Sequence, residues 1–332
     1  MVPVRCAVIG IGMVGTEHAA ILAECAEAEL IACCDTNAER EGFIPPNVAF
    51  HTDLEAVLAA DGLEAVFVCT PQHLHRPVVE QALARGLAVF CEKPIAASLD
   101  DADAMISAAA ASAGPLVIGH TLRFSPDYIA VQQAVSDGDV GTVVHMAARW
   151  NAPDYEGRII SGRTTVPLEM MIHDIDMMRW LAGDVERVYA EAYLPPVTGP
   201  GPDAMVATLR FRSGAIGVLD HNWIMASGSG LDSDHRLAVF GSAGSAFVEN
   251  RDMPAAVFGV GGARQLRTTY YSHPQGISFG ALPTEDRYFL RSVRDGRPWP
   301  IDLADARAAL ACAVALDESA RTGQPVTPPH PA

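Results

Sequence analysis

Lysine is almost absent from this sequence of 332 residues. Of its 23 basic side chains a single one is lysine, Lys93, and all the others are arginines. Arginine carries surface charge as well as lysine does, but its guanidinium does not give up a proton near neutral pH. Lys93 is therefore the first place to look for proton-transfer chemistry.

Positive charge and long apolar runs are also scarce. Acidic residues outnumber basic ones by 40 to 23, and the resulting net charge of −17 argues against nucleic acids and anionic membranes as partners. The longest apolar stretches, 108–118 and 308–316, are shorter than the ~18 residues of a membrane span. Residues 4–9 are patterned as a buried strand with no charged leader before them, so we expect a cytoplasmic protein.

The seven cysteines include no CxxC pair, and their odd number excludes a disulfide scaffold. We expect small core residues at the five that lie in apolar, strand-like runs, Cys6, Cys33, Cys34, Cys69 and Cys91. The histidines His73, His75 and His120 fit the spacing of no standard metal site, and no metal is expected.

Up to about residue 121, short apolar segments alternate with helical patterns. The strand candidates are 4–9, 30–34, 65–69, 87–91 and 116–118, and the helix candidates are 13–26, 53–60, 74–85 and 99–112. Strands separated by helices of this length predict right-handed βαβ crossovers. Because the strands are apolar throughout, we predict a doubly wound parallel sheet covered on both faces.

Beyond residue 122 the rhythm changes to strand-like segments joined by glycine turns, of which Ser213-Gly214 and Ser242-Ala243-Gly244 are the clearest. Strands are predicted at 142–150, 188–194, 204–211, 215–223, 236–240 and 246–250, and helices at 127–136, 172–182, 283–294 and 302–321. The fold class is therefore α/β, with a parallel-sheet domain at 1–121. An α+β domain with a large open, mostly antiparallel sheet follows at 122–332, its C-terminal helix free to pack back on the first domain.

The segment Gly10-Ile11-Gly12-Met13-Val14-Gly15 fits GxGxxG between a strand and a helix, and Asp35 ends the next strand 20 residues later. The first glycine permits the tight turn, the second lets a pyrophosphate approach, and the third brings the helix onto the strand. The helix start offers N–H groups and a positive dipole end to phosphates. Asp35, followed by Thr36, would accept hydrogen bonds from ribose hydroxyls and repel a 2′-phosphate, which favours NAD, while the nearby Arg40 keeps NADP open.

Three further segments complete a family pattern. Thr70-Pro71-Gln72-His73-Leu74-His75 follows the strand at 65–69, Glu92-Lys93-Pro94 follows the strand at 87–91, and His173-Asp174-Ile175-Asp176 opens a helix. Together with the glycine motif, and over nearly its whole length, the chain resembles the Gfo/Idh/MocA oxidoreductases, which include many sugar and cyclitol dehydrogenases.

The resemblance implies a Rossmann domain and a second domain whose open sheet mediates dimer or tetramer contacts, so we expect a homodimer or homotetramer. It implies a cis peptide bond before Pro94. It also implies a catalytic group of Lys93 with an acid and a histidine from the second domain. His173 matches the histidine, and Glu169 stands where the family usually has Asp. The expected cofactor contacts beyond the glycine motif are Asp35, Thr36, Arg40, Cys69, Thr70, Pro71, His73, His75, Glu92 and Lys93.

The residues themselves suit alcohol oxidation, in which a hydride leaves carbon while a base with a near-neutral pKa takes the hydroxyl proton. His173 suits that task without tuning, and Lys93 could stabilise the developing alkoxide and pass the proton on. Glu169 and His173 are spaced i, i+4 and would share a helix face. The expected substrate contacts are Lys93, His120, Arg123, Arg149, Asn151, Glu169, His173 and Asp176.

The sequence therefore predicts an NAD(H)-dependent oxidoreductase that acts on a secondary alcohol, or the matching ketone, of a sugar or cyclitol. The acidic composition makes an amino sugar, including an aminoglycoside, a further hypothesis. Two alternatives stay open: a glycosidase that uses NAD for transient oxidation, and a regulator that binds NAD(P) without catalysis. We expect substrate specificity to lie in the segments 151–167 and 224–234.

Overall fold

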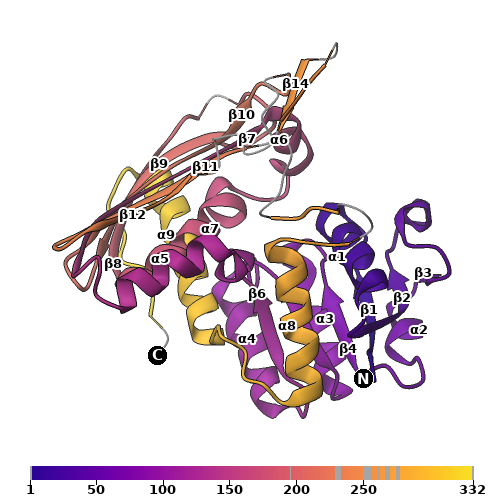
Figure 1. The fold of residues 1–332 in the computed structure, drawn as a ribbon. Helices are drawn as coiled ribbons and strands as arrows, with labels where there is room; N and C mark the ends of the chain where they lie inside the picture. Colours follow the sequence, from indigo (N-terminus) through magenta and orange to yellow (C-terminus); the bar gives the residue numbers. More distant parts are fainter. Residues whose placement is uncertain are drawn as a thin grey trace. The chain divides into compact units, whose positions relative to one another are not determined.

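The computed structural model describes residues 2–194, 196–228, 233–249, 256–259, 262–265, 270–273 and 277–330 (Figure 1). The chain divides into two compact units. The first comprises Met1–Phe124 and Thr269–Arg307, and the second comprises Ser125–Thr268 and Ala308–Ala332. Each unit contains its own six-stranded sheet.

The sheet of the first unit is parallel throughout, as predicted. Its strands run in the order β3-β2-β1-β4-β5-β6, with bounds β1 Val4–Ile9, β2 Ala28–Cys34, β3 Ala49–His51, β4 Ala65–Val68, β5 Ala88–Glu92 and β6 Leu116–Gly119. Strand β3 was not predicted from the sequence because only three residues form it. Parallel strands end at one edge of the sheet, so the loops that follow β1, β2, β4, β5 and β6 gather there.

Helices cover both faces of this sheet. They are α1 Met13–Glu24, α2 Leu54–Leu58, α3 His75–Ala84 and α4 Leu99–Ala111, joined by α8 Ala281–Asp295. Right-handed crossovers place α1 and α3 on opposite faces; α3 packs with α4, and α1 packs with α8. Side chains of Ser98 and Asp53 cap α4 and α2 by accepting hydrogen bonds from first-turn N–H groups.

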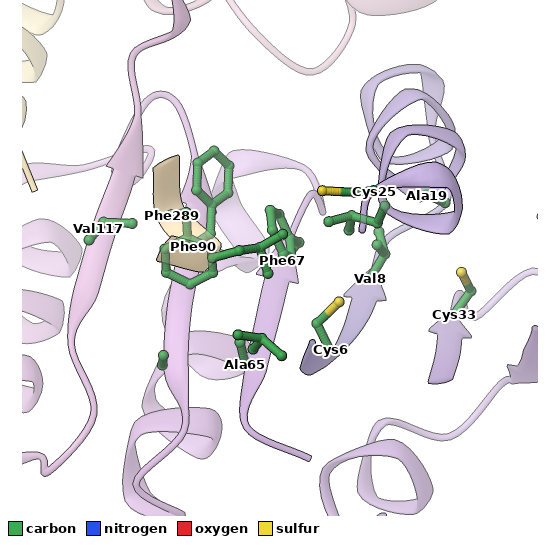
Figure 2. Close-up of a cluster of buried hydrophobic side chains, with 14 of the residues drawn as sticks. Cys6, Val8, Ala19, Cys25, Cys33, Ala65, Phe67, Phe90, Val117 and Phe289 are labelled. Atoms are coloured by element: carbon green, nitrogen blue, oxygen red, sulfur yellow. The ribbon is translucent and has the colours of Figure 1, made fainter. Parts of the chain in front are cut away.

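Helix α8 follows the second sheet in sequence but completes the core of the first unit. Its Phe289 contacts Phe67 of β4 and Phe90 of β5, with ring centroids 5.1 and 5.6 Å away (Figure 2). Cys6 and Cys33 lie buried in the same core, as expected for small apolar residues, and all seven cysteines are free. Burying three phenylalanines at one place accounts for several kcal/mol, at ~1.5–3 kcal/mol each.

The second sheet is mostly antiparallel, as predicted. Its strand order is β12-β11-β7-β10-β9-β8, with bounds β7 Val143–Pro153, β8 Val185–Ala192, β9 Ala204–Phe211, β10 Ile216–Met225, β11 Asp234–Gly241 and β12 Ser245–Glu249. Only β7 and β10 pair in parallel within this sheet, among the residues the structure describes. The predicted glycine turns join β9 to β10 and β11 to β12, and Gly214 has a φ of 92°.

Helices α5 Pro126–Ser136 and α7 Ile172–Ala182 pack together beneath this sheet, and α9 Leu303–Thr322 follows later in the chain. Helix α6 Asp154–Ile160 was not predicted, and it occupies part of the expected specificity segment 151–167. A hairpin of β13 Ala256–Gly259 and β14 Gly262–Gln265 was not predicted either. Residues 229–232 of the other expected specificity segment, and residue 250 of a predicted strand, lie outside the described residues. None of the helices in the described part combines the length and apolarity needed to cross a bilayer.

Candidate active site

The glycine motif forms a turn against the loop that follows β4. Gly10 has a φ of 95°, and a Cβ there would lie 2.7 Å from the backbone of Cys69 and Thr70. A Cβ on Gly15 would lie 1.8 Å from the Gly10 carbonyl oxygen. The fold itself therefore requires glycine at both positions. Gly12 is different, because a Cβ there meets nothing within 4 Å.

This open space lies at the start of α1. Gly12 is the N-cap residue, no side chain caps the helix, and the first helical hydrogen bond runs from the Thr16 N–H to the Gly12 carbonyl. The N–H groups of a first turn have no partner inside their own helix. Together with the helix dipole they suit a phosphate group, so the residues present fit a dinucleotide pyrophosphate.

Asp35 lies at the end of β2, beside the glycine turn. One carboxylate oxygen accepts from the Ile11 N–H at 2.8 Å and the other from the Asn37 N–H at 2.9 Å. Each oxygen has a second lone pair, so the oriented carboxylate can still accept from two ribose hydroxyls. Arg40 places its guanidinium over the Phe43 ring, 5.5 Å from the centroid, and Thr36 is exposed.

The loop after β4 borders the glycine turn and also contacts the Lys93 turn. The Thr70 hydroxyl is buried with no hydrogen-bond partner among the described residues. His75 is buried, with Nε2 2.8 Å from the Thr70 carbonyl and Nδ1 3.1 Å from the Pro94 carbonyl. Burial lowers the His75 pKa, although the hydrogen bonds with these carbonyls act to raise it. Its side chain holds two loops together, whereas His73 is exposed.

Lys93 follows β5 directly, at the same edge as the glycine turn. The expected cis peptide bond precedes Pro94. The buried Glu92 accepts a hydrogen bond from the Lys93 N–H at 3.0 Å, so the side chain before the lysine shapes its turn. His120 and Arg123, which follow β6, are both buried. The first unit thus gathers Gly12, Asp35, Thr70 and Lys93 on loops of one sheet edge.

In the second unit, Glu169 lies in a π-helical turn, Pro167–Met171, that runs directly into α7. The sequence predicted a helix at 172–182, on whose face Glu169 would join His173 if the helix began early enough. The helical turn does include Glu169, but the Ile172 N–H bonds to the Pro167 carbonyl, which adds one residue to the turn. Single π turns are frequent at functional sites. Thr165 anchors the start of this turn by donating to Asp317 at 2.7 Å.

His173 begins α7 and packs on Trp150 of β7, with the ring centroids 5.0 Å apart. The Trp150 ring also stacks on His235 of β11, with the ring centroids 4.1 Å apart. Trp150 pairs across the strands with both His221 and His235. His235 was not singled out from the sequence, because only the strand register places it next to Trp150.

Asp174 follows His173 and is fully buried. His235 Nε2 lies 3.3 Å from one of its oxygens, and His221 Nε2 lies 3.1 Å from the other, without hydrogen-bond geometry in the second contact. Burial acts to raise the Asp174 pKa, but the two histidines outweigh burial and lower it to about 2. A fixed carboxylate therefore anchors α7 to the sheet next to His173, and Asp176 is buried on the same helix.

Arg149 and Asn151 flank Trp150 and, by strand alternation, point to the opposite face of the sheet from it. Arg149 is exposed and pairs with Asp220 at 2.9 Å. Asn151 donates to Asp234 at 3.3 Å. The structure thus separates these two expected substrate contacts from the face that carries His173.

Comparison with known proteins agrees with this geometry. Residues 4–120 match a model of an oxidoreductase family with an NAD-binding Rossmann fold, and residues 128–247 match the GFO/IDH/MocA C-terminal domain. The chain belongs to the GFO/IDH/MocA family. The resemblance drawn from the sequence is confirmed, and so are the Rossmann fold, the NAD cofactor and the class of dehydrogenase acting on CH–OH groups.

Individual relatives have similar lengths. A myo-inositol 2-dehydrogenase of Thermotoga maritima is 30% identical over 95% of this chain and 96% of its own. An inositol 2-dehydrogenase of Rhizobium meliloti is 28% identical over 95% of this chain and 96% of its own. The crystal structure of myo-inositol 2-dehydrogenase from Lactobacillus plantarum has the same fold, with a TM-score of 0.84 at 24% identity over 99% of this chain and all of that one.

Proposed function

We propose that this GFO/IDH/MocA protein oxidises a secondary alcohol of a cyclitol or related sugar with NAD, or reduces the matching ketone. The observation that carries the proposal is the joint placement of Gly12, Asp35 and Lys93 on loops at one edge of the parallel sheet. Ligands of open α/β sheets bind at that edge. The names of the relatives favour inositols within this substrate class.

Bound NAD supplies the ring that accepts the hydride. Lys93 donates to the substrate oxygen and stabilises the negative charge that develops there. His173 takes the hydroxyl proton, a task that suits an imidazole near neutral pH. Glu169 orients the His173 ring or accepts from a neighbouring substrate hydroxyl. Asp174 and Trp150 hold the helix and the ring of His173 in place.

The proposed contacts follow from these placements. NAD would contact Gly10–Gly15, Asp35 and Thr70, whereas the buried His75 shapes their loop. Substrate would contact Lys93, Glu169 and His173. Three further expected substrate contacts are buried, and we propose that they limit the shape of the substrate: His120, Arg123 and Asp176.

The assay follows absorbance of reduced nicotinamide while the protein is mixed with NAD, or with NADP in parallel. The panel contains inositols, neutral sugars and amino sugars. Appearance of reduced nicotinamide with myo-inositol or another cyclitol is the expected result. An amino sugar oxidised faster than its hydroxy analogue would support the narrower hypothesis drawn from the net charge of −17.

Catalytic roles are tested with Lys93→Met, His173→Asn and the double variant. Each single change should lower kcat by about 10²–10⁴-fold while NAD affinity stays near that of the unaltered protein. If both side chains serve one proton transfer, the double variant should lose little more than either single one. A Lys93→Met variant with unaltered turnover would refute the assignment.

The same measurements separate the alternatives. A glycosidase would release sugar from a glycoside without a lasting change in the redox state of NAD. A regulator would bind NAD, seen as a rise in melting temperature, and turn over none of the panel.

We also propose that copies of this chain meet through the open face of the second sheet. Apolar side chains exposed on this face include Val206, Ile216, Phe240 and Phe247. Apolar side chains exposed on one face of a sheet make that face a candidate for contacts between copies. Light scattering should give the mass of a dimer or tetramer, and Val206→Glu with Phe247→Glu should lower it.

A further inference from the structure

A histidine that the sequence analysis did not single out lies beneath the Lys93 turn. His18 is on α1, one turn past Gly15, and its side chain is fully buried. Its Nδ1 lies 2.9 Å from a carboxylate oxygen of Asp286 on α8. Its Nε2 lies 3.0 Å from Oε1 of Glu92 at the end of β5. One ring therefore joins three elements that are far apart in sequence.

Both ring nitrogens of His18 face carboxyl oxygens. An ionised carboxylate only accepts hydrogen bonds, so the ring satisfies both contacts when each nitrogen carries a proton. Burial acts to lower the His18 pKa, but Asp286 and Glu92 together raise it well above its usual range. The rings of Phe67 and Phe90, with centroids 5.6 and 5.3 Å from the imidazole, keep water from this group.

The surrounding acids are not equivalent. Burial favours the neutral form of Glu92, but His18 and the Lys93 charge outweigh burial and lower its pKa. Burial raises the pKa of Asp286, which also faces the charges of Glu92 and Arg287. Burial likewise raises the pKa of Glu285, whose carboxyl group accepts a hydrogen bond from the Thr121 hydroxyl. Glu92 is thus the acid held most firmly as a carboxylate.

Glu92 carries the connection on to Lys93. While its Oε1 accepts from His18, its Oε2 accepts from the Lys93 N–H at 3.0 Å. A continuous path of hydrogen bonds therefore leads from Asp286 through His18 and Glu92 to the backbone of Lys93. The helix that carries His18 is the one whose first turn faces the open space at Gly12.

We propose that His18 is a positioning residue for the dehydrogenase reaction: its hydrogen bond to Glu92 holds the Lys93 turn in a fixed place relative to the nucleotide-binding helix α1. Lys93 can assist hydride transfer only if its ammonium meets a substrate oxygen held beside the nicotinamide. A displacement of ~1 Å at such a site can cost about 10²-fold in rate. This inference rests on the proposed function.

Two matched substitutions separate the two hydrogen bonds of His18. In His18→Gln the amide nitrogen replaces Nε2 and can still donate to Glu92. In His18→Asn the amide nitrogen replaces Nδ1 and can donate only to Asp286. Both variants lose the positive charge and bury a neutral amide, so a purely structural role predicts similar losses of stability and no difference in kcat per folded molecule.

We expect kcat to fall by about 10- to 100-fold in His18→Asn and by about 3-fold in His18→Gln. The dissociation constant of NAD, measured by calorimetry, should change by less than ~3-fold in both, because Asp35 and the first turn of α1 are untouched. Thermal melting would confirm that each variant is folded. Equal kcat values in the two variants would overturn the proposal.

A spectroscopic readout keeps this test independent of the substrate. In protein with ¹⁵N-labelled histidine, the His18 ring, assigned by its loss in the variants, should show both nitrogens protonated at pH 7. A singly protonated ring would overturn the inference even if none of the panel were turned over. Absence of turnover by the unaltered protein would instead count against the proposed function.

Discussion

Gly12→Ala should separate nucleotide binding from folding. Gly12 has φ −81° and ψ −160°, an extended conformation that alanine adopts without strain, and its Cβ would meet nothing within 4 Å. Replacing glycine at a compatible position gains ~0.4–1 kcal/mol through the unfolded chain. Alanine is a poorer N-cap residue by a similar amount. We therefore expect the free energy of unfolding to change by less than ~1 kcal/mol.

NAD binding should respond very differently. The methyl group would project into the space where the pyrophosphate approaches the backbone, and neither the helix start nor the ligand can move away without losing hydrogen bonds. We expect NAD affinity to fall by at least ~100-fold, or ~2.7 kcal/mol. Calorimetric titration with NAD measures the affinity, and urea unfolding measures the stability.

Gly15→Ala is the matched control. Its methyl group would lie 1.8 Å from the Gly10 carbonyl oxygen, so the turn or the helix must shift. Overpacking of this kind costs ~1–3 kcal/mol or more. We expect Gly15→Ala to lower both stability and affinity, whereas Gly12→Ala should lower affinity alone. Normal NAD binding by Gly12→Ala would refute the placement of the pyrophosphate at this turn.

Three further substitutions test other parts of the molecule. Asp35→Ser removes the carboxylate that we expect to accept from the ribose hydroxyls, so the ratio of NAD to NADP affinity should fall by about 10-fold or more in parallel titrations. Burial raises the Asp317 pKa to about 6, so its contribution to stability is present below its unfolded pKa of ~3.9 and lost as the pH rises through 6. The free energy of unfolding of Asp317→Asn should therefore exceed that of the unaltered protein by ~1 kcal/mol at pH 8 and should equal it at pH 3.5. A difference in this free energy that does not depend on pH would contradict the prediction. Trp150→Leu should lower kcat by about 10-fold with unchanged NAD affinity, because the His173 ring loses the tryptophan ring that packs against it. An unchanged kcat would show that Trp150 does not support His173.

Much of the first unit could be predicted because its signals are local. Strands buried on both faces are apolar throughout, and the glycine motif is imposed by close backbone contacts within a few residues, as the Gly10–Gly15 distance shows. The single lysine led directly to the turn after β5. Helix α8 was also recognised as a helix, but its return to the first core depends on Phe289 meeting Phe67 and Phe90, a contact that no local pattern encodes.

The parts that sequence reasoning missed are those built by pairing between distant segments. Trp150 lies next to Arg149 in sequence, yet alternation along β7 puts the two on opposite faces, and only the register with β10 and β11 places His221 and His235 beside Trp150. The bond from Ile172 to Pro167 that makes the π turn has no marker among apolar residues. His18 has the spacing of an ordinary buried helix position, and its two carboxyl partners, Glu92 and Asp286, lie 74 and 268 residues away in the sequence. A cofactor whose shape does not vary is bound by a short motif, and such a motif can be recognised in a single sequence. The groups that hold the reacting side chains in place are assembled by tertiary pairing, so their roles become visible only when the register and the packing are known.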